Sequence, residues 1–301
     1  MVATLGIVKM NKLFYARNRG EIPMQSLSAK DLTLGYGETI IIDELDIEIP
    51  KGEITVFIGG NGCGKSTLLR SLARLLKPLS GSILLDGQEI AKMKTKEVAQ
   101  KLAILPQSPT TPEGLTVYEL VKQGRHPYRG FVKPWSKADE EAVIQALTST
   151  NILNLKDRTV DSLSGGQRQR AWIALTLAQQ TDIILLDEPT TYLDMTHQIE
   201  ILDLLFDLNE KKKHTIVMVL HDLNLSSRYA HHIIAIKNKK VYAQGKPEDI
   251  ITSELVHDVF QMKCNISCDP IFGTPMCIPH GKGRSIDSPQ QTTSPKLSYM
   301  N

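Results

Sequence analysis

A glycine-rich stretch at residues 59–67 carries the clearest chemistry in this chain. It reads Gly-Gly-Asn-Gly-Cys-Gly-Lys-Ser-Thr and fits the pattern of a glycine, four residues and then Gly-Lys-Ser/Thr. Glycines let the backbone curl so that successive N–H groups point at an anion, and a helix that starts there adds its positive end. Lys65 can reach the β- and γ-phosphates of a nucleotide, and the Ser66 hydroxyl can ligate Mg²⁺. The stretch therefore predicts a phosphate-binding loop.

The flanking sequence supports this interpretation. An apolar run at 54–58 leads in and a helix-like run at 66–76 leads out, which is the strand–loop–helix context that a phosphate loop requires. Without that context, the bare pattern would occur by chance in about one chain of this length in a hundred. Cys63 lies at a helix start inside the predicted cradle, so we expect its thiol to face the nucleotide. The predicted nucleotide-binding residues are Gly59, Asn61, Gly62, Cys63, Gly64, Lys65, Ser66 and Thr67.

Two adjacent carboxylates follow a second apolar run. Residues 183–186 are Ile-Ile-Leu-Leu, and Asp187 and Glu188 come directly after them. A buried strand would carry both carboxylates to the sheet edge at which ligands bind in open α/β folds. Asp187 suits the Mg²⁺ shell, and Glu188 suits polarising an attacking water. Taken alone, the run could equally be a strand that ends in acidic residues, but the phosphate loop upstream favours function.

A second candidate anion site lies at residues 163–167, which read Leu-Ser-Gly-Gly-Gln ahead of a helix predicted over 168–180. The Ser164 hydroxyl, the N–H groups of Gly165, Gly166 and Gln167 and the helix N-terminus could together bind an anion. Ser164 could also be an ordinary helix N-cap, and the two interpretations are compatible.

These motifs resemble those of the ATPase subunit of an ATP-binding-cassette (ABC) transporter, over roughly residues 26–280. The sequence at 163–167 resembles the signature that separates this family from other phosphate-loop ATPases. The resemblance implies an α/β fold: a phosphate-loop ATPase core with a mainly parallel sheet, an N-terminal antiparallel β subdomain and a helical insert at about 108–160. It also implies that ATP and Mg²⁺ bind.

The resemblance adds four residues to the site. Gln107 matches the glutamine loop, with a catalytic and Mg²⁺-binding role, and His221 matches the switch histidine. Tyr36 matches the aromatic that stacks on adenine, and Asp194 lies in a Tyr-Leu-Asp sequence that resembles the loop between subunits. Singly, these could be a loop glutamine, a packed histidine, a strand-edge aromatic and a helix cap; their order and spacing favour function. Gly60 departs from the family, which often has proline there, but removes no needed N–H, so we expect no loss of ATP binding.

Family resemblance further implies a head-to-tail dimer with a second copy or a paralogous ATPase. ATP on Lys65 and Ser66 of one subunit would be covered by Ser164 and Gly166 of the other. Partners would be transmembrane permease subunits and, indirectly, a substrate-binding lipoprotein, which places the chain at the cytoplasmic face of the membrane. Residues 123–128, 193–198 and 273–275 resemble subunits that power iron(III)-siderophore import, with haem and vitamin B12 importers as close relatives. That cargo assignment is analogy.

Other classes fit less well. A soluble cassette ATPase acting on DNA or in translation usually has two cassettes or a long coiled-coil insert, whereas this chain has one cassette and a short insert. Intact Glu188 and His221 argue against a regulator that only binds nucleotide. The net charge of +2 predicts no bulk attraction to nucleic acid, and we expect no nucleic-acid partner.

Composition bounds the rest of the chain. The 301 residues are 41% hydrophobic and 23% charged, an ordinary soluble balance, and no apolar run approaches the roughly 20 residues of a membrane span. Four cysteines suggest no disulfide framework; Cys264, Cys268 and Cys277 could hold a metal but have irregular spacing and favour ordinary thiols. Residues 1–25 are predicted to be a disordered extension, with Met24 as a possible true start, and residues 281–301 a disordered tail.

Overall fold

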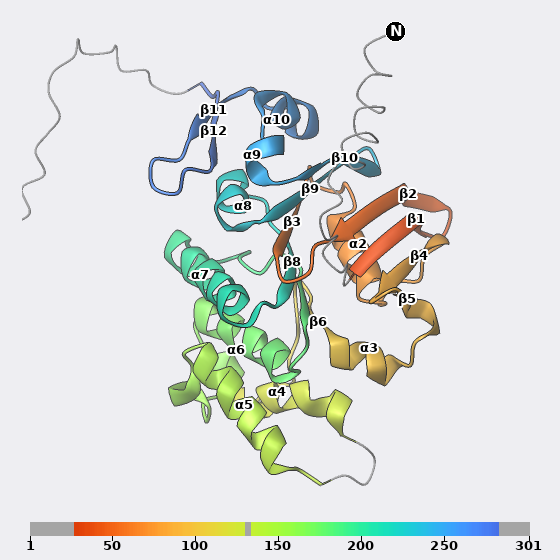
Figure 1. Cartoon of the computed structure of the whole chain (residues 1–301). Helices are drawn as coiled ribbons and strands as arrows, with labels where there is room; N and C mark the ends of the chain where they lie inside the picture. The colour runs from red at the N-terminus through yellow and green to blue at the C-terminus, as the bar shows by residue number, and fades with distance from the viewer. Residues whose placement is uncertain (1–26, 130–133, 283–301) are drawn as a thin grey trace, which may run out of the picture.

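The computed structural model describes residues 27–129 and 134–282. Figure 1 shows a group of helices, α4, α5 and α6 (within residues 117–178), at one end of the molecule, and the C-terminal elements α9, α10, β11 and β12 (within residues 247–279) at the other end, with the larger β-sheets between them. The extension predicted at residues 1–25 lies outside the described residues, as does the predicted tail beyond residue 282. None of the helices within the described ranges is long and apolar enough to cross a membrane.

A six-stranded sheet with the order β10-β9-β3-β8-β7-β6 forms the centre of the protein. Every neighbouring pair in it is parallel except β9 and β10, which confirms the predicted mainly parallel sheet. Because the strands are parallel, the loops that follow β3, β6, β7 and β8 leave from the same edge. The strands are β3 (Ile54–Ile58), β6 (Leu102–Leu105), β7 (Ile183–Leu186), β8 (Thr215–Val219), β9 (His232–Lys237) and β10 (Lys240–Gly245).

A second sheet, β2-β1-β4-β5, is antiparallel, as predicted for the N-terminal part of the chain. Helix α2 (Lys65–Leu72) packs against both sheets: its leucines share one buried cluster with Leu27 of β1 and Phe57 of β3. The helix that starts at the phosphate loop is therefore held from two sides. The strands of the second sheet are β1 (Leu27–Tyr36), β2 (Thr39–Ile49), β4 (Ser80–Leu85) and β5 (Gln88–Glu89).

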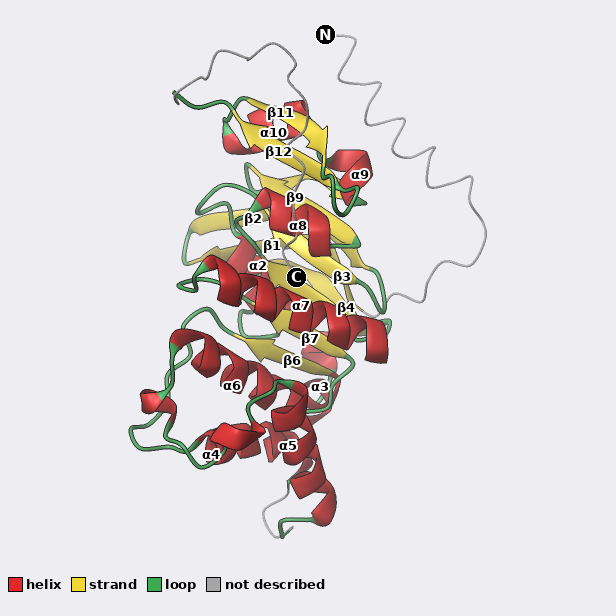
Figure 2. Ribbon diagram, turned by 90° about the vertical axis from the view of Figure 1, so that its left-hand side faces the viewer, coloured by secondary structure: helices red, strands yellow, loops and turns green. Residues whose placement is uncertain are grey.

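Helices cover the opposite face of the central sheet (Figure 2). A second buried cluster lies between these helices and the sheet and includes Val56 of β3, whereas the neighbouring Phe57 belongs to the first cluster. This is expected because successive side chains along a strand point to opposite faces of the sheet. Helix α7 (Met195–Lys212) buries Ile201, Leu202, Leu205 and Leu208 on one face, while Ile199 is half-buried.

The helical end contains α4 (Val117–Lys122), the 3₁₀ helix η2 (Gln123–Tyr128), α5 (Lys137–Ser149) and two short 3₁₀ turns, η3 (Leu153–Leu155) and η4 (Val160–Ser162). Helices α4 and α5 begin at capping boxes, formed by Thr116 with Glu119 and by Ser136 with Asp139. Both helices pack against α6 (Gly165–Ala178), so the helical layer extends beyond residue 160.

A buried arginine joins these helices. Arg125 of η2 pairs through Nε with Asp139 Oδ1 at 3.0 Å, and both side chains are about 95% buried. Its guanidinium also donates to the Ala178 carbonyl and to Gln180, and it stacks on the Tyr128 ring. Gly124 must be glycine because a Cβ there would lie 2.3 Å from the Leu175 carbonyl oxygen.

We expect Arg125→Ala to lower the free energy of unfolding by about 3 kcal/mol or more, because it leaves Asp139 buried without its cation. Urea unfolding followed by circular dichroism measures this change. The matched control is Lys137→Ala in the exposed Lys137–Glu141 pair, which should change stability by less than about 0.5 kcal/mol. Equal effects of the two substitutions would show that the Arg125 pair does not hold the helices together.

Two predicted helix bounds were wrong. Helix α2 ends at Leu72 rather than 76, because Arg74 takes a left-handed backbone conformation (φ 60°). Helix α6 begins at Gly165 rather than 168. Several elements had no clear sequence signal. These are η1 (Ile90–Lys92), α3 (Thr95–Lys101), α8 (Leu223–Tyr229) and a C-terminal hairpin of β11 (Cys264–Cys268) and β12 (Pro275–Pro279). The hairpin follows two short helices, α9 (Pro247–Ile250) and α10 (Ser253–Phe260).

Candidate nucleotide site

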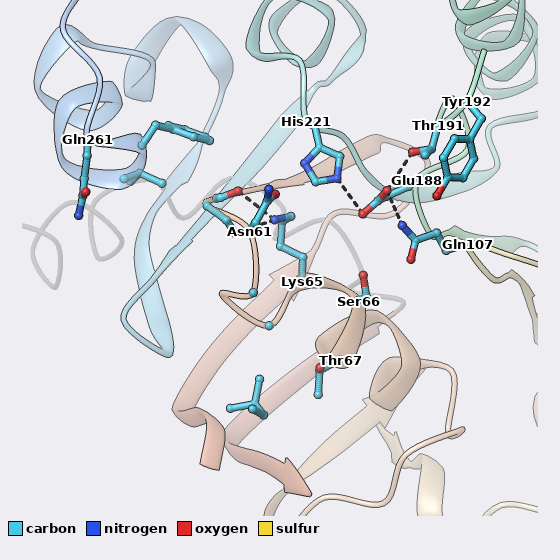
Figure 3. A pocket seen from close by; sticks show the side chains of 17 residues that line it. Asn61, Lys65, Ser66, Thr67, Gln107, Glu188, Thr191, Tyr192, His221 and Gln261 are labelled. Carbon is cyan, nitrogen blue, oxygen red and sulfur yellow. Dashed lines mark hydrogen bonds and ion pairs between the residues drawn. The ribbon is translucent and has the colours of Figure 1, made fainter. Parts of the chain in front are cut away.

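A cavity of about 1110 Å³ opens at the edge of the central sheet where β3, β6, β7 and β8 end. The phosphate loop follows β3, Gln107 follows β6, Glu188 follows β7 and His221 follows β8, and all of them line this cavity (Figure 3). Residues predicted separately from four parts of the chain therefore meet in one place.

The phosphate loop holds a buried cation. Lys65 is only 5% exposed, and its Nζ donates to the Gly59 and Gly60 carbonyl oxygens at 2.9 and 3.0 Å. Among the residues that the structure describes, no carboxylate lies within ion-pair distance of this ammonium. Burying an unpaired charge is costly, so an anion arriving in the cavity would compensate it.

The start of α2 depends on glycine. Gly64 precedes the helix with φ 104°, a conformation that residues with a side chain rarely adopt. A Cβ on Gly64 would also lie 2.8 Å from Ile42 Cδ1 of β2. The loop can therefore present its N–H groups to the cavity only with this residue at the turn.

Ser66 and Asp187 form an oxygen-rich pair at the base of the loop. The Ser66 hydroxyl donates to Asp187 Oδ1 at 2.8 Å, and Asp187 is 4% exposed. Burial raises the pKa of Asp187, although the hydrogen bond from Ser66 opposes this shift. A hydroxyl and a carboxylate are hard oxygen donors of the kind that Mg²⁺ prefers together with substrate phosphates, so this donor set fits the ion.

Three side chains converge on Glu188 (Figure 3). His221 Nε2 lies 2.7 Å from Oε1, while Gln107 Nε2 and Thr191 Oγ1 donate to Oε2 at 2.7 and 2.9 Å. Burial alone would raise the pKa of Glu188, but the hydrogen bonds from His221, Thr191 and Gln107 together lower it below its usual value. The carboxylate is therefore ionised at neutral pH and fixed in orientation.

The backbone of Glu188 is unusual. Its φ of 52° lies in the left-handed region, which is uncommon for a residue with a long side chain. Such conformations persist where the surrounding contacts hold them and are concentrated at functional sites.

Some predicted residues lie elsewhere. Tyr36 is about half exposed at the end of β1 and does not line the cavity within the described chain; Ile41 of β2 does. Cys63 lines a second cavity of about 330 Å³ beside Lys237 and Lys239. Its thiol packs against the Gly59 position, and its access to the nucleotide stays a prediction.

The second candidate anion site is separate from the cavity. Ser164 caps α6 in a reciprocal capping box with Gln167, so Gly165 and Gly166 form the first turn of that helix. Asp194 caps α7 by accepting the His197 N–H at 2.9 Å. Both motifs are therefore helix caps with exposed side chains. Within the described chain, neither Ser164 nor Asp194 lines the cavity that contains the phosphate loop.

The three C-terminal cysteines differ in how far they are buried. Cys264 and Cys277 are buried in the hairpin, and burial raises the pKa of Cys277 to about 11, whereas Cys268 is exposed. Within the described ranges, no three His, Cys, Asp or Glu side chains gather as a metal-binding group.

Comparison with known proteins decides the family. The family model described as "ABC transporter" matches residues 42–191. The chain is 70% identical to the probable siderophore transport system ATP-binding protein YusV of Bacillus subtilis (strain 168), over 87% of this chain and 96% of that protein. The chain belongs to the ABC transporter family. It is also 51% identical to the ferric enterobactin transport ATP-binding protein FepC of Escherichia coli (strain K12), over 85% of this chain and 94% of that one.

Solved ABC structures agree with this fold. A metal-chelate-type ABC transporter in an inward-facing conformation matches with a TM-score of 0.74 at 29% identity, covering 86% of this chain and 98% of that chain. The dimeric structure of MJ0796, a bacterial ABC transporter cassette, matches with a TM-score of 0.65 at 30% identity, covering 73% and 98%. This chain is thus an ATPase of the ABC transporter type that binds ATP.

In this ABC ATPase, the structure adds cavity residues that the sequence did not indicate. Thr191 and Tyr192 follow Glu188 in the same loop, and Gln261, with its neighbours at 259 and 260, comes from the end of α10. Gly60 lies against α10, since a Cβ there would be 3.7 Å from the Val259 carbonyl oxygen. Of these residues, only Thr191 could have been placed near the cavity from the sequence, because it follows Glu188 by three residues.

Proposed function

We propose that this ABC ATPase hydrolyses ATP to energise import of an iron(III)-siderophore complex through a membrane permease. The observation that carries the ATPase part is the buried Lys65 ammonium, whose partners are neutral loop carbonyls and which faces the cavity that also contains Glu188. The cargo is supported by the names of two relatives, the probable siderophore transport protein and the ferric enterobactin transport protein.

In this proposal the loop residues Gly59 to Thr67 bind the phosphates of ATP, and Lys65 turns from its carbonyl partners toward the β- and γ-phosphates. Ser66 and Asp187 would hold Mg²⁺, and the amide oxygen of Gln107, which is not used in the bond to Glu188, would be a third ligand. Bound Mg²⁺ would neutralise charge that develops on the phosphates.

Glu188 accepts a hydrogen bond from the attacking water and directs it at the γ-phosphorus. As the new P–O bond forms, the bond to the β–γ bridging oxygen breaks, which yields ADP and phosphate. His221 carries its proton on Nε2, because a carboxylate can only accept, and so holds Glu188 in the ionised form. Tyr36 does not line the cavity in this structure. To stack on adenine, Tyr36 would therefore have to move toward the cavity with the end of β1.

A second subunit completes the site. Ser164, Gly165, Gly166 and Gln167 of one chain cover the γ-phosphate bound to the other, and Asp194 lies in the same interface. Because the γ-phosphate bridges two helix N-termini, ATP favours the closed dimer and hydrolysis reopens it. Gln107 and the helical layer carry this motion to the permease, at the cytoplasmic face of the membrane, and a substrate-binding lipoprotein delivers the cargo from outside.

The test is uptake of radiolabelled iron(III)-siderophore by cells of the source organism that lack this chain. We expect uptake to be lost and to be restored by the wild-type chain but not by Lys65→Ala. Uptake of haem and of vitamin B12 in the same cells is the matched control and should be unchanged. Loss of haem or vitamin B12 uptake with normal siderophore uptake would assign the other cargo, and no uptake defect of any kind would favour a non-transport ATPase.

A further inference from the structure

His197 lies against the first turn of the signature helix in the same chain. A Cβ on Gly166 would lie 2.3 Å from His197 Cδ2 and 3.0 Å from its Cγ, so the imidazole occupies the space that any side chain at Gly166 would need. The backbone of Gly166 is not in the left-handed region, so conformation alone does not require glycine there. Within one subunit, a side chain at this position would therefore have to displace the His197 ring.

The same ring is fixed by Asp194. His197 Nδ1 lies 2.8 Å from Asp194 Oδ1, and the His197 backbone N–H donates to the same oxygen at 2.9 Å. Since a carboxylate only accepts hydrogen bonds, Nδ1 carries the proton. The imidazole is thus held at one edge by the cap of α7 while its other edge rests on α6.

A second contact joins the same two segments, and a hydrogen bond braces the loop from within its own segment. A Cβ on Gly165 would be 3.5 Å from Leu193 Cδ2, and Gln198 Nε2 donates to the Leu193 carbonyl at 2.9 Å. Tyr192 in this loop is 90% exposed, which leaves it free to meet another chain. The loop at 192–194 and the turn at 164–167 are therefore packed together and presented to the outside.

We propose that His197 is a positioning residue that locks the loop at 192–194 to the first turn of α6, so that both meet the second subunit as one preformed surface. This inference rests on the proposed shared site, because the surface has a function only if a second subunit binds to it. Without the imidazole, the loop and the turn can shift relative to one another, and dimer formation must then order them.

The test uses the Glu188→Gln protein, in which ATP should trap the dimer, and measures ATP-dependent dimerisation by sedimentation velocity. We expect His197→Ala to weaken dimerisation by about three- to tenfold, because dimer formation must then also order the loop at 192–194 against the turn at 164–167. ATP affinity of the monomer and the melting temperature should stay unchanged, because His197 does not line the Lys65 cavity. A purely structural role would change both of those quantities.

Two further variants sharpen the test. His197→Asn should restore most of the dimerisation, because its amide can donate to Asp194 from a position close to that of Nδ1. His257→Ala removes an exposed imidazole on α10 and should have no effect.

Dimerisation of His197→Ala equal to that of its parent would overturn the inference, as would a loss in His197→Asn as large as in His197→Ala. A parallel fall of melting temperature would also overturn it, by showing a structural role. If the Glu188→Gln parent itself does not dimerise with ATP, the proposed shared site fails, and this inference fails with it.

Discussion

Glu188→Gln should retain ATP binding but slow hydrolysis by a factor of about 10²–10⁴, the usual contribution of a positioned general base. In the structure, both oxygens of Glu188 accept hydrogen bonds, from His221 on one side and from Gln107 and Thr191 on the other. An amide has only one accepting oxygen, so its NH₂ group would face at least one of these donors. The substitution removes the charge and also disturbs the orientation of the group.

The same variant should accumulate as an ATP-bound dimer, because closure needs only binding whereas reopening needs hydrolysis. Phosphate release measures turnover, and size-exclusion chromatography with light scattering measures the dimer. Glu141→Gln, which changes an exposed glutamate on α5, is the control and should behave as wild type. Turnover of Glu188→Gln close to the wild-type rate would remove Glu188 from the mechanism.

The residues around Glu188 show how far sequence reasoning reaches. Ser66, Asp187 and Glu188 could be predicted to lie together because a phosphate loop and a second buried strand must end at the same edge of a parallel sheet. The structure brings them together, with the Ser66 hydroxyl 2.8 Å from Asp187. Such predictions succeed because strand direction fixes where a residue at a strand end must lie.

Other features depended on details that the sequence does not fix. The glycines at 165 and 166 disfavour a helix interior, which led us to begin α6 too late, although the pattern of Ser164 with Gln167 three residues on is a capping-box signal. Nothing in the sequence indicates which side of the phosphate loop the Cys63 thiol occupies, or that Gln261 of α10 borders the cavity. These contacts join segments far apart in the chain and arise only from packing.

Lys65→Ala should weaken ATP binding by roughly a hundredfold or more, because it removes charge-assisted hydrogen bonds from a buried site. Ser164→Arg should spare ATP binding, since Ser164 does not line the cavity, but should block closure through its bulk at the covering turn. Each variant alone should therefore be inactive. Equilibrium binding of a fluorescent ATP analogue and ATPase assays with the permease present separate the two defects.

A control distinguishes bulk at the interface from loss of a helix cap. Ser136 caps α5 in the same kind of capping box as Ser164, so Ser136→Arg makes the same chemical change at an equivalent position on another helix. Both substitutions should cost about 1 kcal/mol of stability, as the loss of an N-cap does. Only Ser164→Arg should abolish ATPase activity, because only that cap is proposed to cover ATP.

Mixing the two inactive variants tests whether the site is shared. In a mixed dimer, one site combines an intact Lys65 with an intact Ser164, while the other site carries both defects. If ATP is held between subunits, the mixture with the permease should regain measurable ATPase activity that neither variant has alone. Because two working sites could be required for turnover, ATP-dependent crosslinking from a photoreactive group at Ser164 is measured as well. Crosslinks from Ser164 that reach only the phosphate loop of its own chain would contradict the shared site, whereas crosslinks to the partner subunit would support it even without recovered activity.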